Sequence, residues 1–248
     1  MRNIILSLFI PILFIFAWNQ PVFSQEKAVA LLEYDHDVTG DGVPNKITLY
    51  GIPFDENAKF YKKVWAEIAL PDSKKIRIDY EGGYEPKLEF VDLNHDGVDD
   101  ILYSSATGGS GGLYNYALHT VKNGELKEIP LPTPLDIEGT FENDFKAVIK
   151  IPGLKNPVIL DLSSRKEEYI SLGLFQKNGM LNEATELMID PIAFFKIVKI
   201  ENKKGFGLKS FRQVSGAYHA DGLGTVEARW YYENGNWSLV DVKWNGDK

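Results

Sequence analysis

Short stretches in which apolar and polar residues alternate recur from about residue 46 to the end of the chain. They are rich in β-branched and aromatic residues and are bounded by Gly, Asn, Pro or Asp, a pattern typical of β-strands. Helical periodicity is scarce, and residues 183–188 are the best short helix. The pattern predicts an all-β protein. The predicted strands are residues 46–50, 75–79, 87–91, 101–103, 114–118, 147–151, 157–160, 194–200, 224–232 and 237–244.

Turn residues between the predicted strands indicate how they are connected. Residues 233–236 read Glu-Asn-Gly-Asn, and Asn-Gly tolerates the positive φ angles of a tight hairpin turn. Residues 130–134 hold three prolines, which suit a connector better than a strand. No low-complexity linker occurs, so residues 25–248 are expected to form a single β domain. A division near residue 130 is the alternative.

The start of the chain has the organisation of a secretory signal peptide. A basic residue, Arg2, precedes an apolar stretch over residues 4–18, and small or moderate residues lead up to a cleavage position after Ser24. The stretch of 15 residues is shorter than the about 20 needed to span a bilayer, although an uncleaved anchor is the alternative. We therefore expect removal of residues 1–24 and secretion of the remainder.

Composition narrows the classes of partner and of chemistry. The 248 residues include 27 basic and 35 acidic side chains, giving a net charge of −8, and contain no long basic run. Nucleic acid and anionic membrane surfaces are therefore not expected as partners. Cysteine is absent, which excludes disulfides, thiolate metal sites and cysteine nucleophiles. A secreted chain without disulfides must be stabilised by its core or by a metal ion.

Two acidic segments of matching pattern begin 55 residues apart. Residues 37–47 read DVTGDGVPNKI and begin with the first acidic loop. Residues 92–101 read DLNHDGVDDI and begin with the second. Each has oxygen-bearing side chains at positions 1, 3, 5 and 9, glycine at position 6, and at position 7 a valine that offers its carbonyl oxygen. Ca²⁺ takes about six to eight oxygen ligands, and a turning backbone lets alternate residues converge on one ion. The predicted ligands are Asp37, Thr39, Asp41, Val43 and Asn45 in the first loop and Asp92, Asn94, Asp96, Val98 and Asp100 in the second.

Several features qualify this interpretation. The loops are not EF-hands, because position 12 is Thr48 or Tyr103 rather than glutamate and strand patterns follow. An acidic turn without an ion is the alternative, since Asp, Asn and Gly are ordinary turn residues. The second loop has three carboxylates and the first has two, so the second is expected to bind Ca²⁺ more tightly. His36 and His95 raise zinc as an alternative ion, although residues adjacent to the ligands should point away from it.

Acidic turns that lead into apolar strands resemble the calcium-binding repeats of the integrin-alpha-like, VCBS and FG-GAP β-propeller group. That group's loop reads Asp-x-Asp/Asn-x-Asp-Gly-x-x-Asp. The second loop matches it throughout, whereas Thr39 and Asn45 depart from it in the first. The resemblance covers residues 28–125, with degenerate copies of the unit over 131–248, and implies a small or incomplete propeller of about four β-sheets. A β-sandwich is the alternative.

The function expected from these residues is binding rather than catalysis. We expect a secreted, noncatalytic protein in which Ca²⁺ holds acidic turns and rim loops that present a surface to a protein or a glycan. The alternative is an extracellular hydrolase or carbohydrate-active enzyme with structural Ca²⁺, for which Glu81 and Glu85 are candidate carboxylates. The glycine-rich residues 107–112 lack the Lys-Ser/Thr ending of a phosphate-binding loop. They are interpreted as a wide turn or as a rim that admits a ligand.

Overall fold

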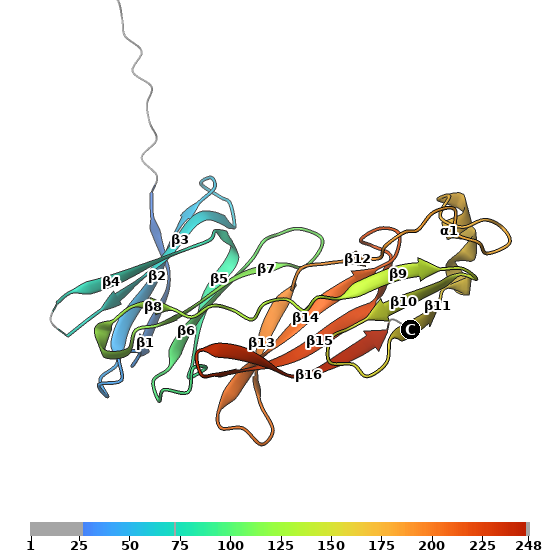
Figure 1. Ribbon diagram of the computed structural model, residues 1–248. Helices are drawn as coiled ribbons and strands as arrows, with labels where there is room; N and C mark the ends of the chain where they lie inside the picture. Colours follow the sequence, from blue (N-terminus) through green and yellow to red (C-terminus); the bar gives the residue numbers. More distant parts are fainter. Residues whose placement is uncertain (1–26, 72, 247–248) are drawn as a thin grey trace, which may run out of the picture.

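Antiparallel strands make up nearly all of the regular structure (Figure 1). The computed structural model describes residues 27–71 and 73–246, so the expected signal peptide, residues 1–24, lies outside the described residues. The all-β class is confirmed. In chain order the elements are β1 (Val29–His36), β2 (Asn45–Pro53), β3 (Phe60–Ala69), β4 (Lys75–Tyr80), β5 (Gly83–Val91), β6 (Asp100–Ala106), β7 (Tyr114–Thr120), the 3₁₀ turn η1 (Lys122–Gly124), β8 (Lys127–Glu128), β9 (Glu138–Glu142), β10 (Lys146–Lys150), β11 (Val158–Asp161), the 3₁₀ turn η2 (Ser163–Arg165), α1 (Lys166–Ser171), β12 (Met188–Ile189), β13 (Phe194–Lys199), β14 (Phe206–Ser215), β15 (Gly222–Glu233) and β16 (Asn236–Gly246).

The N-terminal half is one eight-stranded sheet: seven strands follow the order β1-β2-β3-β5-β6-β7-β8, and β4 pairs with β3 outside this order. The strand β3 divides it, because β4 pairs with residues 64–69 and β5 pairs only with Phe60 and Tyr61. Alternation sets the two faces: in β2, Ile47 and Leu49 are buried while Thr48 and Tyr50 are partly exposed. These buried side chains join others from β3 to β6 in a core that belongs to this sheet.

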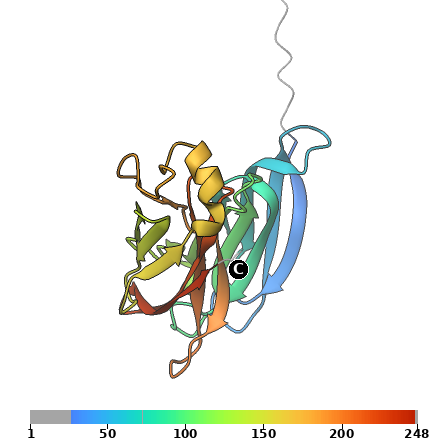
Figure 2. The ribbon, with the colours of Figure 1, turned by 90° about the vertical axis from the view of Figure 1, so that its right-hand side faces the viewer.

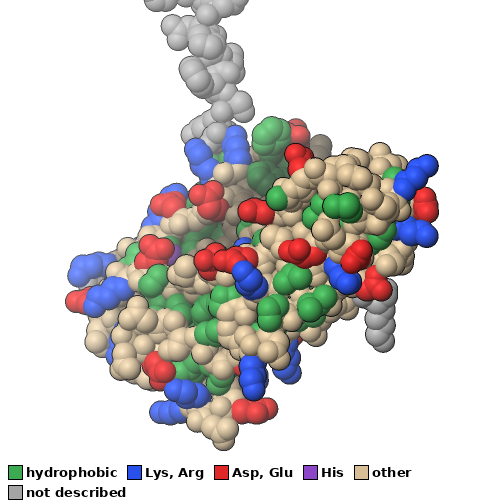
Figure 3. Space-filling view, turned by 45° about the vertical axis from the view of Figure 1, so that its right-hand side comes forward, with side chains coloured by type: hydrophobic (Ala, Val, Ile, Leu, Met, Phe, Trp, Pro, Cys, Tyr) green, Lys and Arg blue, Asp and Glu red, His purple; other side chains and the backbone are tan. Residues whose placement is uncertain are grey.

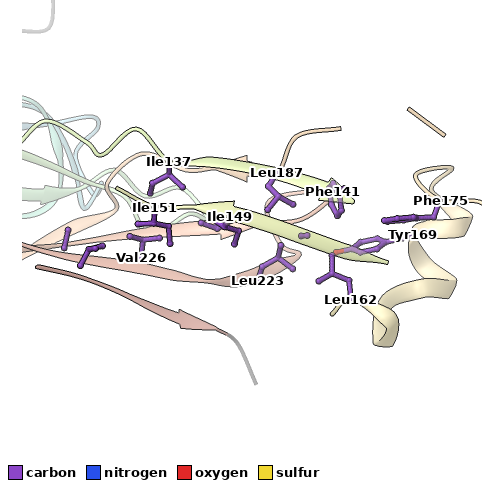
Figure 4. Close-up of a cluster of buried hydrophobic side chains, with 14 of the residues drawn as sticks. Ile137, Phe141, Ile149, Ile151, Leu162, Tyr169, Phe175, Leu187, Leu223 and Val226 are labelled. Atoms are coloured by element: carbon purple, nitrogen blue, oxygen red, sulfur yellow. The ribbon is translucent and has the colours of Figure 1, made fainter. Parts of the chain in front are cut away.

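The C-terminal half contains two sheets that face each other. One has the order β11-β10-β9, and the other has the order β12-β14-β15-β16 with β13 beside β14. Phe141 and Ile149 from the first sheet meet Leu223 and Val226 from the second in a shared core (Figure 4). Tyr169 of α1 closes this core at the end of the molecule farthest from the N-terminal sheet (Figures 1 and 2).

A third group of buried side chains joins the two halves. Leu93, Leu102 and Leu118 from the N-terminal half pack in one cluster with Leu208 of β14. The Tyr116 hydroxyl also donates a hydrogen bond of 3.2 Å to the carbonyl of Phe195 in β13. The halves therefore share hydrophobic contacts as well as the connecting chain at residues 129–137.

Two sequence-based expectations need correction. Three antiparallel sheets of eight, three and five strands replace the expected four similar sheets, and the described residues form no closed propeller. Residues 183–188 are not helical, because this segment runs beside β9: Phe141 N donates to Thr185 O at 3.0 Å, and Leu187 N donates to Gly139 O at 2.9 Å. Tertiary pairing has overridden local helix propensity there. The hairpin turn at residues 233–236 is confirmed, with φ of 54° at Asn234 and 81° at Gly235.

The surface carries both signs of charge. On the face shown in Figure 3, acidic and basic side chains are interspersed, with hydrophobic side chains between them. In the part of the chain that the structure describes, no helix is both long and apolar enough to cross a membrane.

Candidate functional site

The two acidic loops share three internal hydrogen bonds. The first joins β1 to β2 and the second joins β5 to β6. In each, the glycine amide at position 6 donates to the position 1 carboxylate, at 2.8 and 3.0 Å. The position 7 amide donates to the position 5 carboxylate, at 2.8 and 3.0 Å, and the position 2 amide donates to the position 9 side chain, at 3.1 and 2.9 Å. The sequence repeat is therefore also a structural repeat.

The loops lie side by side at one edge of the N-terminal sheet. The Val98 side chain packs on Gly40, where an added Cβ would overlap with Cγ2 of Val98. The turn η1 contacts both loops: Asn123 N donates to Thr39 O at 2.9 Å, and Lys122 Nζ donates to Asp96 O at 2.6 Å. The Lys122 ammonium also lies 3.5 Å from the Asp96 carboxylate. Lys122 thus supplies positive charge to the second loop.

Asp100 is the buried member of the second loop. Its carboxylate has no exposed surface and accepts the amides of Leu93 and Asn94 at 2.9 and 3.0 Å. Burial raises the pKa of Asp100 to about 7; the two amides oppose this rise, while the charges of Asp96 and Asp92 add to it. The Asn94 side-chain amide also donates to this carboxylate at 3.0 Å, and even with these three donors burial remains the larger influence on its pKa.

The remaining predicted ligands of the second loop are arranged as short polar turns. Asp92 and Asn94 both accept the Asp96 amide, at 3.1 and 2.9 Å. Among the described residues, no group of three or more His, Asp and Glu side chains is close enough to hold a metal ion. Coordination would therefore depend on the amide oxygen of Asn94, the carbonyl of Val98 and water in addition to carboxylates.

The first loop satisfies its own polar groups more fully. Asn45 accepts the Val38 amide at 3.1 Å and donates to Ala69 O at 3.2 Å, so the residue that departs from the acidic pattern ties the loop to β3. Desolvation acts to raise the pKa of Asp37, but hydrogen bonds from Gly40, Gly42 and Thr39 together lower it. The structure explains Asn45 as a structural residue.

The histidines beside the loops have other neighbours. His36 Nε2 lies 2.8 Å from Asp99 Oδ2, and its ring stacks on Phe90. His95 stacks on Tyr231 of β15 with ring centroids 4.3 Å apart. Each ring is thus occupied with packing, and the zinc alternative gains no set of ligands from the described residues.

A polar cleft of about 780 Å³ lies between the two halves, away from the acidic loops. The glycine-rich loop between β6 and β7 lines one side through Gly109, Ser110 and Gly111. The turn between β14 and β15 lines the other side and carries His219. His219 Nδ1 lies 2.9 Å from Oδ1 of Asp190, which precedes β13. The cleft is also lined by Leu113, Arg165, Glu168, Pro191, Gln213, Tyr218, Ala220, Asp221 and Gly222.

The turn that carries His219 is fixed by a buried network. Asp221 accepts the Tyr169 hydroxyl at 2.6 Å and the Ala217 amide at 2.9 Å, and it forms an ion pair with Arg165. Gly216 is required at the start of the turn, because a Cβ there would overlap with Asp221 and Tyr169. The turn is therefore a rigid support rather than a loose surface loop.

Sequence reasoning missed Asp190 and His219 as a pair, because 29 residues separate them. One signal was present nearby. Residues 108–112 read Gly-Gly-Ser-Gly-Gly, which fits the Gly-x-Ser-x-Gly pattern of serine hydrolases. The context differs from the usual one, since two antiparallel strands rather than a strand and a helix flank the serine.

Comparison with known proteins gives two similarities. A family model described as the YybI C-terminal domain matches residues 135–245. The protein named "Uncharacterized protein YybI" from Bacillus subtilis (strain 168) is 25% identical over 244 residues, an alignment that covers 94% of this chain and 85% of that protein. No solved structure matches the chain. The family match spans β9 to β16 and includes Asp190 and His219, whereas both acidic loops lie outside it.

The resemblance to the integrin-alpha-like, VCBS and FG-GAP group is wrong. The family model that matches is that of the YybI C-terminal domain, with no VCBS or FG-GAP match. A loop of nine residues is short, and two strands with an acidic turn between them occur in many β proteins. The acidic loops must therefore be judged by their own geometry.

Proposed function

We propose that this protein is a secreted, calcium-binding β protein and that its second acidic loop holds the ion. The observation that supports this most is the buried Asp100 carboxylate beneath two further acids, Asp92 and Asp96, within nine residues of chain. A divalent cation would compensate this concentration of negative charge far better than the Lys122 ammonium beside Asp96. The carboxylate, amide and carbonyl oxygens present are the donors that Ca²⁺ prefers.

The residues of the second loop have distinct roles in this proposal. Asp92, Asn94 and Asp96 supply side-chain oxygens, and Val98 supplies its carbonyl. Asp100 contributes negative charge from below while its own oxygens hold the backbone at Leu93 and Asn94. Water completes the coordination. The first loop has fewer carboxylates and satisfies its own polar groups, so it binds more weakly or serves as a turn.

The ion has a structural role in this proposal. The second loop lies where the halves meet, because His95 stacks on Tyr231 and Leu93 belongs to the shared core. Fixing the loop would therefore fix the junction and the surface loops around it. In this proposal that surface is presented to a protein or a glycan.

Calorimetric titration with Ca²⁺ tests the assignment. Extracellular calcium modules often bind with dissociation constants of roughly 10⁻⁴–10⁻³ M, so millimolar titrant is needed. We expect Asp96→Ala to abolish the tighter site, because it removes a charged ligand that stays accessible at the loop surface. Asp41→Ala is the matched control at the same position of the first loop and should leave the tighter site intact.

A third variant separates loss of binding from loss of folding. Lys122→Met removes the ammonium beside Asp96 but keeps a long side chain, so Ca²⁺ should bind more tightly than to the unaltered protein. Unchanged affinity in Asp96→Ala, or loss of the tighter site in Asp41→Ala alone, would overturn the assignment to the second loop.

A further inference from the structure

The polar cleft between the halves presents a histidine whose position is fixed from several sides. His219 has a side chain that is 73% exposed, whereas its partner Asp190 is only 13% exposed. The His219 backbone carbonyl accepts hydrogen bonds from the Gln213 side-chain Nε2 at 2.8 Å and from the Ser215 hydroxyl at 3.0 Å. Exposed ion pairs contribute only about 0–1 kcal/mol to stability. The contacts of His219 therefore add little to stability, and their main effect is to hold the exposed ring in one orientation.

The Asp190 side of the pair is equally well held. The Asp190 amide donates to Gln213 O at 3.1 Å, and Arg212 Nε donates to Asp190 O at 2.7 Å. The Asp190 carboxylate contacts Nδ1 of His219, so Nε2 is the ring nitrogen that points away from Asp190. This is the arrangement in which a carboxylate sets the tautomer of a general base.

Two of the four glycines in the glycine-rich loop on the opposite side of the cleft are not required by the backbone or by packing. Gly108 and Gly112 have φ of 84° and 60°, which favour glycine. Gly109 has open space where a Cβ would lie, and at Gly111 the nearest atom would be at 3.6 Å, an ordinary contact; neither has a positive φ. Close approach of a ligand to the backbone is a further reason for glycine. In the described part of the chain, the Ser110 and Gly111 amides donate to no protein acceptor.

We propose that this cleft is a serine acyl-hydrolase site, with Ser110 as nucleophile, His219 as general base and Asp190 as the carboxylate that orients the base. Ser110 and His219 line the same cleft, and no hydrogen bond joins their side chains. Such contacts are often long before substrate binds. The Gly111 amide follows the nucleophile and is free to stabilise an oxyanion.

Charge around the cleft selects the class of substrate. Glu168, Asp190 and Asp221 line it against one arginine, Arg165, which Asp221 already neutralises. A free carboxylate or phosphate would be repelled by this excess of negative charge. The substrate class is therefore a neutral carboxylic ester, whose carbonyl oxygen becomes negative only during the reaction.

The reaction balances with water as the second substrate. Ser110 Oγ attacks the carbonyl carbon while His219 Nε2 takes the hydroxyl proton, and the carbonyl oxygen becomes an oxyanion. The bond to the alcohol oxygen then breaks, His219 returns the proton to it, and an acyl-serine remains. Water attacks this ester by the same route, with the release of the carboxylic acid and free Ser110.

The site is independent of the calcium proposal. The second acidic loop precedes β6 and the glycine-rich loop follows it, so the two lie at opposite ends of that strand (Figure 1). The two proposals share no residue, so a failure to bind Ca²⁺ would not contradict the serine proposal, and the converse also holds.

Labelling with a fluorophosphonate tests the proposal without knowledge of the natural ester. The reagent phosphonylates an activated serine with loss of fluoride, and peptide mass spectrometry locates the adduct. We expect Ser110 to be labelled in the full chain and labelling to vanish in Ser110→Ala. His219→Gln should slow it by about 100-fold or more, as removal of a general base does.

Two further variants keep the experiment interpretable. His36→Gln removes the other His–Asp pair, at 2.8 Å, and should leave labelling unchanged, which separates an organised site from the reactivity of any exposed imidazole. Gly109→Val should leave the thermal midpoint of the protein unchanged, since space is open at that position. It should slow labelling, because the added side chain would block the approach of the reagent to the glycine-rich loop. Absence of an adduct on Ser110, or equal labelling rates with and without His219, would overturn the proposal.

Discussion

At the scale of single residues, burial of titratable groups distinguishes structural from functional side chains. Asp100 is buried with compensating amides from its own loop, and Asp221 is buried with three partners that fix a turn. His119 of β7 differs, because its Nδ1 is buried and has no hydrogen-bond partner among the described residues. Such a group is tolerated only while it is neutral. His119 is therefore a site where pH acts on the fold itself.

Acidification should destabilise the protein partly through His119. Burial lowers the pKa of His119; the nearby Glu128 acts the other way, and Tyr80 packs edge-to-face on the ring. Because the folded state then binds fewer protons than the unfolded state, stability is lost as the pH falls below the ordinary histidine pKa of about 6.5. Urea unfolding of the unaltered protein and of His119→Leu at pH 8 and pH 5.5 measures this. The variant should lose less stability between the two pH values, and equal losses would contradict the assignment.

At the scale of elements, a strand could be predicted from the sequence when its buried and exposed residues alternate. The strand β2 buries every second residue, and its pattern was visible in the sequence. The strand β3 was missed because Val64, Trp65 and Ala66 are buried consecutively. The short β9 was missed because it contains Gly139, where a Cβ would lie only 2.9 Å from Leu187. Neither packing relation can be read from local sequence.

The candidate sites show the same division. The acidic loops could be predicted because all their polar groups lie within nine residues, and the structure confirms that they form equivalent turns. Their contact through Gly40 and Val98 could not be predicted, since it depends on sheet pairing. The pair of Asp190 and His219 likewise exists only because the strand β14 brings both to one cleft.

The packing of one acidic loop on the other can be tested with two glycines of the first loop. Gly40 and Gly42 have similar φ of 79° and 84°, so alanine at either costs about 1–2 kcal/mol of backbone strain. Only at Gly40 does the added Cβ overlap with Val98, which adds about 1–3 kcal/mol. Gly40→Ala should therefore lower the free energy of unfolding more than Gly42→Ala does.

A double variant supplies the control for this comparison. In a Val98→Ala background the overlapping methyl group is absent, so Gly40→Ala should cost about as much as Gly42→Ala. Equal effects of the two glycine substitutions in the unaltered protein would show that the loops do not pack together as described.

At the scale of the whole molecule, the two halves meet where the second acidic loop lies. His95 stacks on Tyr231, and Leu93 enters the core that also contains Leu208. The conformation of this nine-residue loop therefore affects the contact between the eight-stranded sheet and the pair of facing sheets. An ion bound in this loop would stabilise the molecule beyond the loop itself.

Calcium should raise the thermal midpoint of the protein from residue 25 onward. Without the ion, Asp92, Asp96 and the buried Asp100 repel one another in a chain whose net charge is −9 once Arg2 is removed. Unfolding disperses the ligands, so Ca²⁺ binds the folded state preferentially, and at a free concentration 100 times the dissociation constant one site contributes roughly 2.7 kcal/mol. Each kcal/mol moves the midpoint of a domain of this size by about 2–4 °C, which gives a shift of roughly 5–11 °C.

Thermal unfolding in excess EDTA and in millimolar Ca²⁺ measures this shift. Mg²⁺ is the control and should have a smaller effect, because it demands a tight octahedron and loses water reluctantly. Coincident curves in EDTA and Ca²⁺ would mean that the loops are acidic turns held by their own amides.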